Sequence, residues 1–172
     1  MHPLHSFKYC PRCGSEHFIE NNFKSRKCER CGFVYYFNPA AATAIFITNK
    51  VGELLVVRRA KEPAKGTFDL PGGFVDLNET AEEAIVREVK EETGLQISPP
   101  CYLFSLPNIY PYSGFDVHTV DLFYQYQIDA FSGLQAGDDA ESLYFLPKDE
   151  IHPEAFGLNS IRKAVEVWMG LL

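Results

Sequence analysis

The chain has 172 residues and a formal net charge of −7, and 46% of its residues are apolar and 23% are charged. These proportions are those of a globular protein and exclude a disordered one. No apolar stretch approaches the roughly 18 residues that a membrane-spanning helix needs, and no apolar segment follows Met1 as it would in a secretory signal. We therefore expect a cytoplasmic protein with reduced cysteines and no membrane partner.

The length allows one full domain of about 150 residues and a small additional domain. The charge is unevenly distributed along the chain. Residues 1–36 hold six basic and three acidic side chains, whereas the remainder holds ten basic and twenty acidic ones. Because an acidic body repels phosphate groups and bare nucleic acid, a phosphorylated ligand would need cations between itself and the protein.

Four of the five cysteines form two pairs near the N-terminus, Cys10-x2-Cys13 and Cys28-x2-Cys31. Two intervening residues let one tight turn direct both sulfurs at one ion, and the glycine that follows each pair permits the positive φ of such a turn. Two of these turns predict a tetrahedral four-sulfur zinc site. A redox pair, two disulfides or an iron site are the alternatives. The segment between the pairs, Glu16 to Lys27, is expected to form a short hairpin.

Four thiolates leave no coordination position for water or substrate, so we expect the Zn²⁺ ion to be structural. The ribbon has few large apolar side chains, and metal binding would supply the energy for its folding. Half of its basic side chains lie in or beside the cysteine turns, where they balance the negative charge of the site, and we expect no nucleic-acid partner. Cys101 has no sequence partner and is predicted to be a buried thiol.

A turn at Asn38-Pro39 divides the chain into a ribbon, residues 1–37, and a main domain, residues 38–172. In chain order, the main domain is predicted to contain strands at 40–48 and 53–59 joined by a turn at 49–52, a helix at 81–93, strands at 102–106, 117–128 and 142–145, and a helix at 158–171. The first helix begins with a capping box and ends at a glycine. Elements in this order suggest an α/β protein in which helices cover both faces of a sheet.

The first helix places carboxylates beside its apolar stripe. At 100° per residue, Ile85 and Val89 lie on the core-facing side, Glu88 and Glu92 fall close to them, and Glu91 flanks them. A solvated charged face is the usual explanation for a helix rich in glutamate. That explanation does not cover Glu88 and Glu92, because buried unpaired carboxylates are unfavourable.

These carboxylates need cations. Arg87 is expected to pair with Glu83 and Glu91 at i,i+4 spacing. Glu88 and Glu92 are then left for a hard divalent ion such as Mg²⁺ or Mn²⁺, which prefers oxygen ligands.

The same region resembles a known family. The pattern Gly73-x5-Glu79-x7-Arg87-Glu88-Val89-x-Glu91-Glu92-x-Gly94-Leu95 matches the Nudix box at every defined position. The resemblance implies a Nudix-type α/β/α sandwich with a mixed sheet. It also implies Mg²⁺-dependent hydrolysis of a nucleoside diphosphate linked to another moiety, with AMP and a second phosphate ester as products. By the same resemblance, Glu88, Glu91, Glu92 and the Gly73 carbonyl bind the metal, and Arg87 and Glu79 orient the cluster.

The cysteine ribbon followed by Tyr36-x-Asn38-Pro39 and this box is similar to the zinc-ribbon Nudix hydrolases, which act on NADH, ADP-ribose or FAD. The NADH group has the signature S-Q-P-W-P-F-P-x-S after the box. The corresponding stretch here, Ser105 to Ser113, lacks the Gln and the Trp and has Tyr110 in place of the Phe. We therefore expect ADP-ribose, FAD or NAD(H) as the substrate, with a closer resemblance to the ADP-ribose and FAD branch.

Other residues are candidates for substrate binding. Tyr110, Tyr112 and Phe115 could stack on a base, and a core aromatic cluster is the alternative. Arg58 and Arg59 end a strand near the box. Because alternation places them on opposite faces, at most one should contact phosphate.

A glutamate between the strands predicted at 117–128 and 142–145 completes the candidates. Glu141 aligns with a loop glutamate of the resembled proteins and is predicted to be an extra metal ligand or general base, with a solvated loop acid as the alternative. His118 is predicted to be structural.

The alternative function is a non-catalytic nucleotide sensor or nucleic-acid-binding regulator that uses the ribbon, and removal of nucleotide caps from RNA is a further hypothesis. The resemblance also suggests a homodimer.

Overall fold

The computed structural model describes residues 3–129, 134 and 140–171, with the backbone alone at 140 and 141. Its strands are β1 (Phe18–Asn22), β2 (Ser25–Cys28), β3 (Val34–Tyr36), β4 (Ala40–Asn49), β5 (Leu54–Arg59), β6 (Phe68–Asp69), β7 (Gly72–Phe74), β8 (Cys101–Tyr112), β9 (Phe115–Ile128) and β10 (Ala140–Leu146). Its helices are α1 (Ala81–Thr93), α2 (Asn159–Met169) and the short 3₁₀ helices η1 (Pro3–Ser6), η2 (Lys148–Glu150) and η3 (Pro153–Ala155). The chain forms two compact units, residues 1–39 with 109–118, and residues 40–108 with 119–172.

The first unit is a small antiparallel sheet of β1, β2 and β3. The predicted hairpin is confirmed: β1 pairs with β2, and Phe18 lies opposite Cys28, with both side chains buried. The tip of the β8–β9 hairpin belongs to the same unit, because the Phe115 ring packs against the rings of Phe7 and Phe37 at centroid distances of 6.2 Å. The predicted ribbon, residues 1–37, does not include this second segment, residues 109–118.

The second unit is built on a mixed sheet. Its strand order is β10-β5-β4-β9-β8, with β6 beside β5 and β7 beside β4. β4 and β9 run parallel, with Ala42 opposite Asp121, whereas β4 is antiparallel to β5 and to β7. The parallel pair at the centre explains why β4 is buried on both faces over most of its length.

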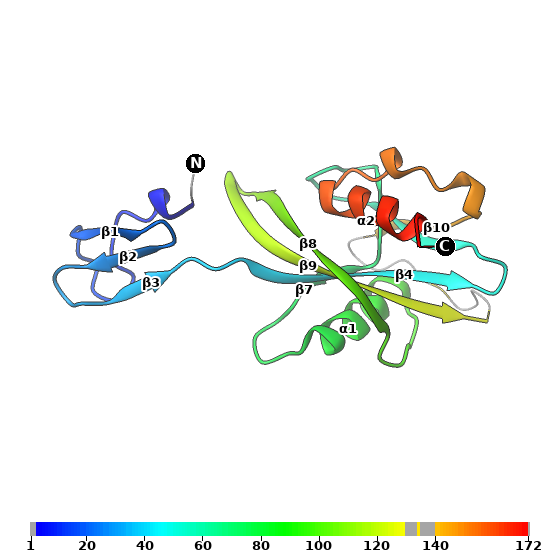
Figure 1. Cartoon of the computed structure of the whole chain (residues 1–172), viewed down its shortest axis with the longest axis horizontal. Coiled ribbons are helices and arrows are strands. Elements are labelled where there is room, and N and C mark those ends of the chain that lie inside the picture. Colours follow the sequence, from blue (N-terminus) through cyan, green and yellow to red (C-terminus); the bar gives the residue numbers. More distant parts are fainter. Residues whose placement is uncertain (1–2, 130–133, 135–139, 172) are drawn as a thin grey trace. The chain divides into compact units, whose positions relative to one another are not determined.

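Alternation along β4 divides the core into two layers. Ile45 and Ile47 pack with Ile85 and Val89 of α1, whereas Phe46 packs on the other face with α2. Figure 1 shows α1 and α2 on opposite sides of the sheet. The predicted α/β/α sandwich with a mixed sheet is therefore confirmed.

The main differences from the sequence analysis lie in the edge strand and the short strands. β8 is much longer than its predicted range, 102–106, and the short strands β6 and β7 were not predicted. The prediction for Cys101 was wrong, because this residue begins the edge strand β8 and its side chain is exposed. Among the described residues, no helix is both long and apolar enough to span a bilayer.

Candidate active site

Helix α1 begins and ends as predicted, and these ends fix the direction of its carboxylates. The Thr80 hydroxyl accepts a hydrogen bond from the Glu83 amide at 3.2 Å, and the Glu83 carboxylate accepts one from the Thr80 amide at 2.8 Å. The predicted capping box is thus present. Gly94 ends the helix in the left-handed conformation, with φ of 75°.

Two glycines of β7 bring its backbone close to β4 and to this helix. A Cβ atom at Gly72 would overlap with the backbone of Thr43 and Ala44 in β4. A Cβ atom at Gly73 would overlap with the carboxylate of Glu88 in α1. Only glycine permits the approach of Gly72 to the β4 backbone, whereas a side chain at position 73 would displace the Glu88 carboxylate. The Gly73 carbonyl in turn accepts a hydrogen bond from the Thr43 hydroxyl at 3.4 Å.

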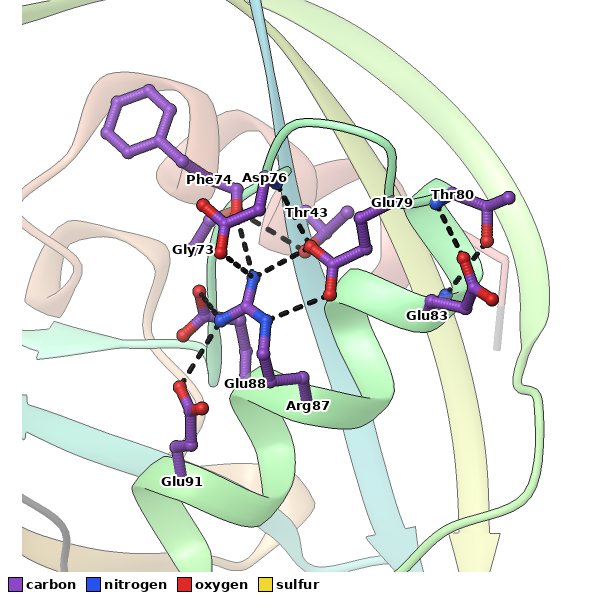
Figure 2. Close-up of polar contacts among 10 residues, drawn as sticks. All are labelled: Thr43, Gly73, Phe74, Asp76, Glu79, Thr80, Glu83, Arg87, Glu88 and Glu91. Atoms are coloured by element: carbon purple, nitrogen blue, oxygen red, sulfur yellow. Dashed lines mark hydrogen bonds and ion pairs between the residues drawn. The ribbon is translucent and has the colours of Figure 1, made fainter.

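The Arg87 guanidinium lies at the centre of the cluster, as Figure 2 shows. Its Nε and Nη2 atoms donate to the two carboxylate oxygens of Glu79, each at 2.9 Å. Its Nη1 atom donates to Glu88 at 2.8 Å and to Glu91 at 3.2 Å. Nη2 also donates to the Phe74 carbonyl at 3.1 Å. One positive charge therefore forms hydrogen bonds with three carboxylates, and the excess negative charge favours a further cation.

These contacts correct the expected partners of Arg87. The pair with Glu91 is present, but the Glu83 carboxylate is engaged in the capping box and Glu88 is itself a partner of Arg87. Glu92 accepts a hydrogen bond from the Gly72 amide at 3.0 Å. Helical spacing alone could not show that Arg87 turns toward Glu79, which precedes the helix.

The ionisation of the carboxylates differs with their surroundings. Burial raises the pKa of Glu88, although the bond from Arg87 acts in the opposite direction. The two hydrogen bonds from Arg87, followed by one from the Asp76 amide, lower the pKa of Glu79. Glu79 is thus stabilised as an anion by Arg87, whereas burial disfavours the anion of Glu88 despite its bond from Arg87.

The two candidate phosphate-binding arginines have different surroundings. Arg59 forms an ion pair with Asp69, both side chains being largely buried, and its Nε donates to the Pro63 carbonyl at 2.7 Å. Arg58 lies over the Tyr144 ring, 5.7 Å from its centroid, and its Nε donates to the Gly66 carbonyl at 3.1 Å. Because Arg59 is already neutralised by a carboxylate, Arg58 is the better candidate.

The remaining predicted residues are not joined to this cluster by the structure. Tyr110, Tyr112 and Phe115 belong to the first unit, and the carboxylates belong to the second. The Tyr110 and Tyr112 rings stack on each other with centroids 6.3 Å apart. The backbone of Glu141 lies in β10, but its side chain is outside the described part of the structure. The base-stacking and general-base roles stay predictions.

Three contributors to the cluster were not predicted: the Thr43 hydroxyl, the Phe74 carbonyl and Asp76. Asp76 lies 3.9 Å from the Arg87 guanidinium, and its amide donates to Glu79. The position of Asp76 three residues before Glu79 was a usable sequence signal for this turn. The other two contacts depend on the pairing of β4 with β7, which no local pattern reveals.

The four cysteines of the first unit form a second candidate site. Their sulfur atoms all lie within 4.8 Å of one another, with Cys10 and Cys31 separated by 3.7 Å and Cys13 and Cys28 by 3.6 Å. A tetrahedron of zinc–sulfur bonds of about 2.3 Å has edges of about 3.8 Å. The four cysteines are therefore positioned for one metal ion, and none of them forms a disulfide.

Sequence comparisons identify relatives of the chain. A model of the NUDIX domain matches residues 38–166. An ADP-ribose pyrophosphatase of Methanocaldococcus jannaschii is 37% identical over 136 residues, which cover 77% of this chain and 76% of that protein. An NAD-capped RNA hydrolase NudC of Vibrio vulnificus is 28% identical over 112 residues, 65% of this chain. The match covers 42% of that relative, so the chain spans about two fifths of its length.

Solved structures have the same fold. A NUDIX hydrolase from Nitrosomonas europaea superposes with a TM-score of 0.74 at 20% identity and covers 95% of this chain and 90% of that one. A MutT NUDIX hydrolase from Burkholderia pseudomallei gives a TM-score of 0.61 at 28% identity, over 76% of this chain and 98% of that one.

Proposed function

Because the chain belongs to the NUDIX domain family, we propose that it hydrolyses the pyrophosphate bond of a nucleoside diphosphate linked to a second moiety, and that Mg²⁺ or Mn²⁺ is required. The observation that supports this most is the close approach of the Gly73 backbone to the Glu88 carboxylate, beside Glu91, Glu92 and Arg87. The products are AMP and a second phosphate ester.

The donor set fits a hard divalent ion. The proposed ligands are the carboxylates of Glu88, Glu91 and Glu92 and the carbonyl of Gly73, all of them oxygen atoms. Burial raises the pKa of Glu88 even beside Arg87, so a metal ion at Glu88 would stabilise its anion further. When bound, divalent ions neutralise the pyrophosphate and lower the pKa of the attacking water.

The protein residues have supporting roles in this proposal. Arg87 holds Glu88 and Glu91 in place, and Glu79 holds Arg87 through two hydrogen bonds. Arg58 is proposed to contact phosphate, and the predicted general base is Glu141. Catalysis then depends mainly on positioning and charge neutralisation, as in phosphoryl transfer generally.

ADP-ribose is the first substrate to test, since the archaeal relative carries that name and is matched over three quarters of both chains. NAD(H) and FAD follow.

In the first unit, we propose that the four cysteines bind one structural Zn²⁺ ion, because a shell of four sulfurs leaves no position for a substrate. A cytoplasmic location and a homodimer stay predictions.

The experiment is a substrate panel. Purified protein is incubated with ADP-ribose, FAD or NADH and Mg²⁺, and AMP is measured by chromatography. Glu92→Gln should lower turnover by about 10²-fold or more, as loss of one preorganised electrostatic group does. Glu82→Gln is the matched control, because Glu82 lies on the same helix, is exposed, and accepts its hydrogen bond from Tyr124 through an oxygen that glutamine keeps.

Absence of AMP from all three substrates would contradict the proposal and favour the non-catalytic sensor. Near-normal turnover by Glu92→Gln, with the fold checked by circular dichroism, would remove Glu92 from the site.

A further inference from the structure

A pocket of about 540 Å³ lies in the second unit, away from the carboxylates. It is bounded by the ends of β4 and β9, the start of β8, the short helix η2 and the last turn of α2. Its lining includes Thr48 of β4, five residues beyond Thr43, which pairs with Gly73. At about 3.3 Å per residue, that separation along the strand is about 17 Å.

The pocket also has part of its lining on the other face of the sheet, while Tyr126 of the α1 layer lines it as well. Phe46 and Trp168 line it, and both belong to the core layer of α2, whereas the carboxylates project from α1. This pocket is therefore separate from the candidate active site.

The charged residues that line the pocket are all basic. They are Lys50 and Lys148, and no carboxylate is among the described lining residues. Lys50 also contacts Asp129 at 2.9 Å, at an exposed position. Lys148 forms no ion pair within the described part of the chain, and the acidic residues that follow it, 149 and 150, do not line the pocket. A lysine ammonium group is a suitable point charge for a phosphate.

The rest of the lining suits a heteroaromatic ring. Strand register places Gln125 beside Phe46 and Gln127 beside Thr48, so both amides lie on one face. A glutamine amide can donate and accept together on the edge of adenine. Behind these amides, the Phe46 and Trp168 rings stack on each other 4.7 Å apart with an interplanar angle of 7°, as a largely buried apolar wall.

We propose that this pocket binds a nucleoside monophosphate, with its phosphate at Lys148 and its base at Gln125 and Gln127. The choice of AMP as the probe rests on the proposed function, since AMP is a product there, but the pocket itself does not depend on that function. The chain has a single tryptophan, Trp168, so its fluorescence reports directly on this wall. The exposed thiol of Cys101 also lines the pocket and gives a second readout.

The test is a titration of Trp168 fluorescence with AMP, without added divalent metal, in the full-length protein. We expect a saturable change in fluorescence and protection of Cys101 from alkylation. Lys148→Ala should weaken AMP binding about tenfold or more, the effect of losing one hydrogen bond to a charged group. Lys163→Ala, an exposed lysine of α2 outside the pocket, is the control and should bind AMP normally.

Two further arms separate the parts of the ligand. Inorganic phosphate should compete weakly and lose its effect in Lys148→Ala, whereas Gln127→Ala should weaken AMP but not phosphate. Glu92→Gln should leave the AMP titration unchanged, because it alters only the candidate active site.

The proposal is wrong if AMP at millimolar concentration gives no saturable change, or if Lys148→Ala binds AMP as the wild type does. It is also wrong if Glu92→Gln abolishes the change, since the signal would then come from the active site. None of these results bears on AMP production in the substrate panel, so the two proposals fail separately.

Discussion

The Gly73 backbone and the Glu88 carboxylate lie so close together that a side chain at position 73 would displace the carboxylate. β7 supplies the glycine and α1 supplies the glutamate, and neither group can approach the other unless both elements pack on β4. This contact brings the backbone of β7 against a carboxylate of α1, and we propose that a metal ion binds there.

Gly73→Ala should displace the Glu88 carboxylate and lower kcat by about 10²-fold, the effect of a misplacement of about 1 Å in an active site. The measurement is the rate of AMP formation together with the affinity for Mn²⁺. Gly170→Ala is the control, because the backbone of Gly170 is helical and a Cβ there would make only ordinary contacts, at 3.4 Å or more. If Gly73→Ala keeps normal turnover, the position of the Gly73 carbonyl is not needed for metal binding.

The Thr43 hydroxyl should fix the direction of the Gly73 carbonyl. Thr43→Val removes the 3.4 Å hydrogen bond while it keeps the shape of the side chain, and Thr43→Ser restores the donor. A neutral hydrogen bond of this kind contributes about 1 kcal/mol, so Mn²⁺ affinity should fall by about fivefold in the valine variant. Calorimetry of Mn²⁺ binding without substrate measures this effect. Equal affinities in the valine and serine variants would show that the hydroxyl has no positioning role.

Glu79→Gln should lower stability in a pH-dependent way. Arg87 lowers the pKa of Glu79 below its usual value of 4.5 in the folded state. The anion therefore stabilises the folded protein at pH values above the unfolded pKa, and this contribution is lost as the pH falls through the lower folded pKa. The free energy of unfolding of the wild type should exceed that of the variant at pH 7, and the difference should shrink below about pH 4.5.

Urea unfolding of both proteins between pH 3.5 and pH 7, without added Mg²⁺, tests this expectation about the Glu79 carboxylate. Loss of metal from the cysteines at low pH affects both proteins alike and cancels in the comparison. A difference that grows as the pH falls would have the wrong sign and would contradict the assigned cause.

Removal of one ribbon cysteine should abolish metal binding there. Cys28→Ser leaves three sulfurs, and the first unit should lose its order because metal binding supplies much of its folding energy. Elemental analysis should find one zinc per chain in the wild type and none in this variant, and limited proteolysis should cut residues 1–39 first. Cys101→Ser is the matched control and should keep its zinc, because Cys101 lies outside the cluster. Equal zinc content in both variants would contradict a four-sulfur site.

Local patterns in the sequence were sufficient for several elements. The helix at 81–93 was predicted with its residue limits, because its caps and its apolar spacing lie within the segment itself. The spacing of the two cysteine pairs was sufficient to predict the four-sulfur cluster, because each pair lies in one local turn. The five longer strands of the second unit were found from runs of apolar residues, although β6 and β7 were missed. The length of β8 was underestimated, since an edge strand is exposed and has no continuous apolar run.

The tertiary structure alone decided which groups meet. The partners of Arg87, the contact between Gly73 and Glu88, and the bond from Thr43 to Gly73 all join residues that are distant in the sequence or lie on different elements. Cys101 proved exposed for the same reason, because its burial depends on the neighbours of β8 and not on its own chemistry. The sequence thus determined the chemical groups of the site and the local elements that hold them. The packing of α1 and β7 on β4 determined their geometry, because distances between elements depend on strand pairing and core packing that no local pattern encodes.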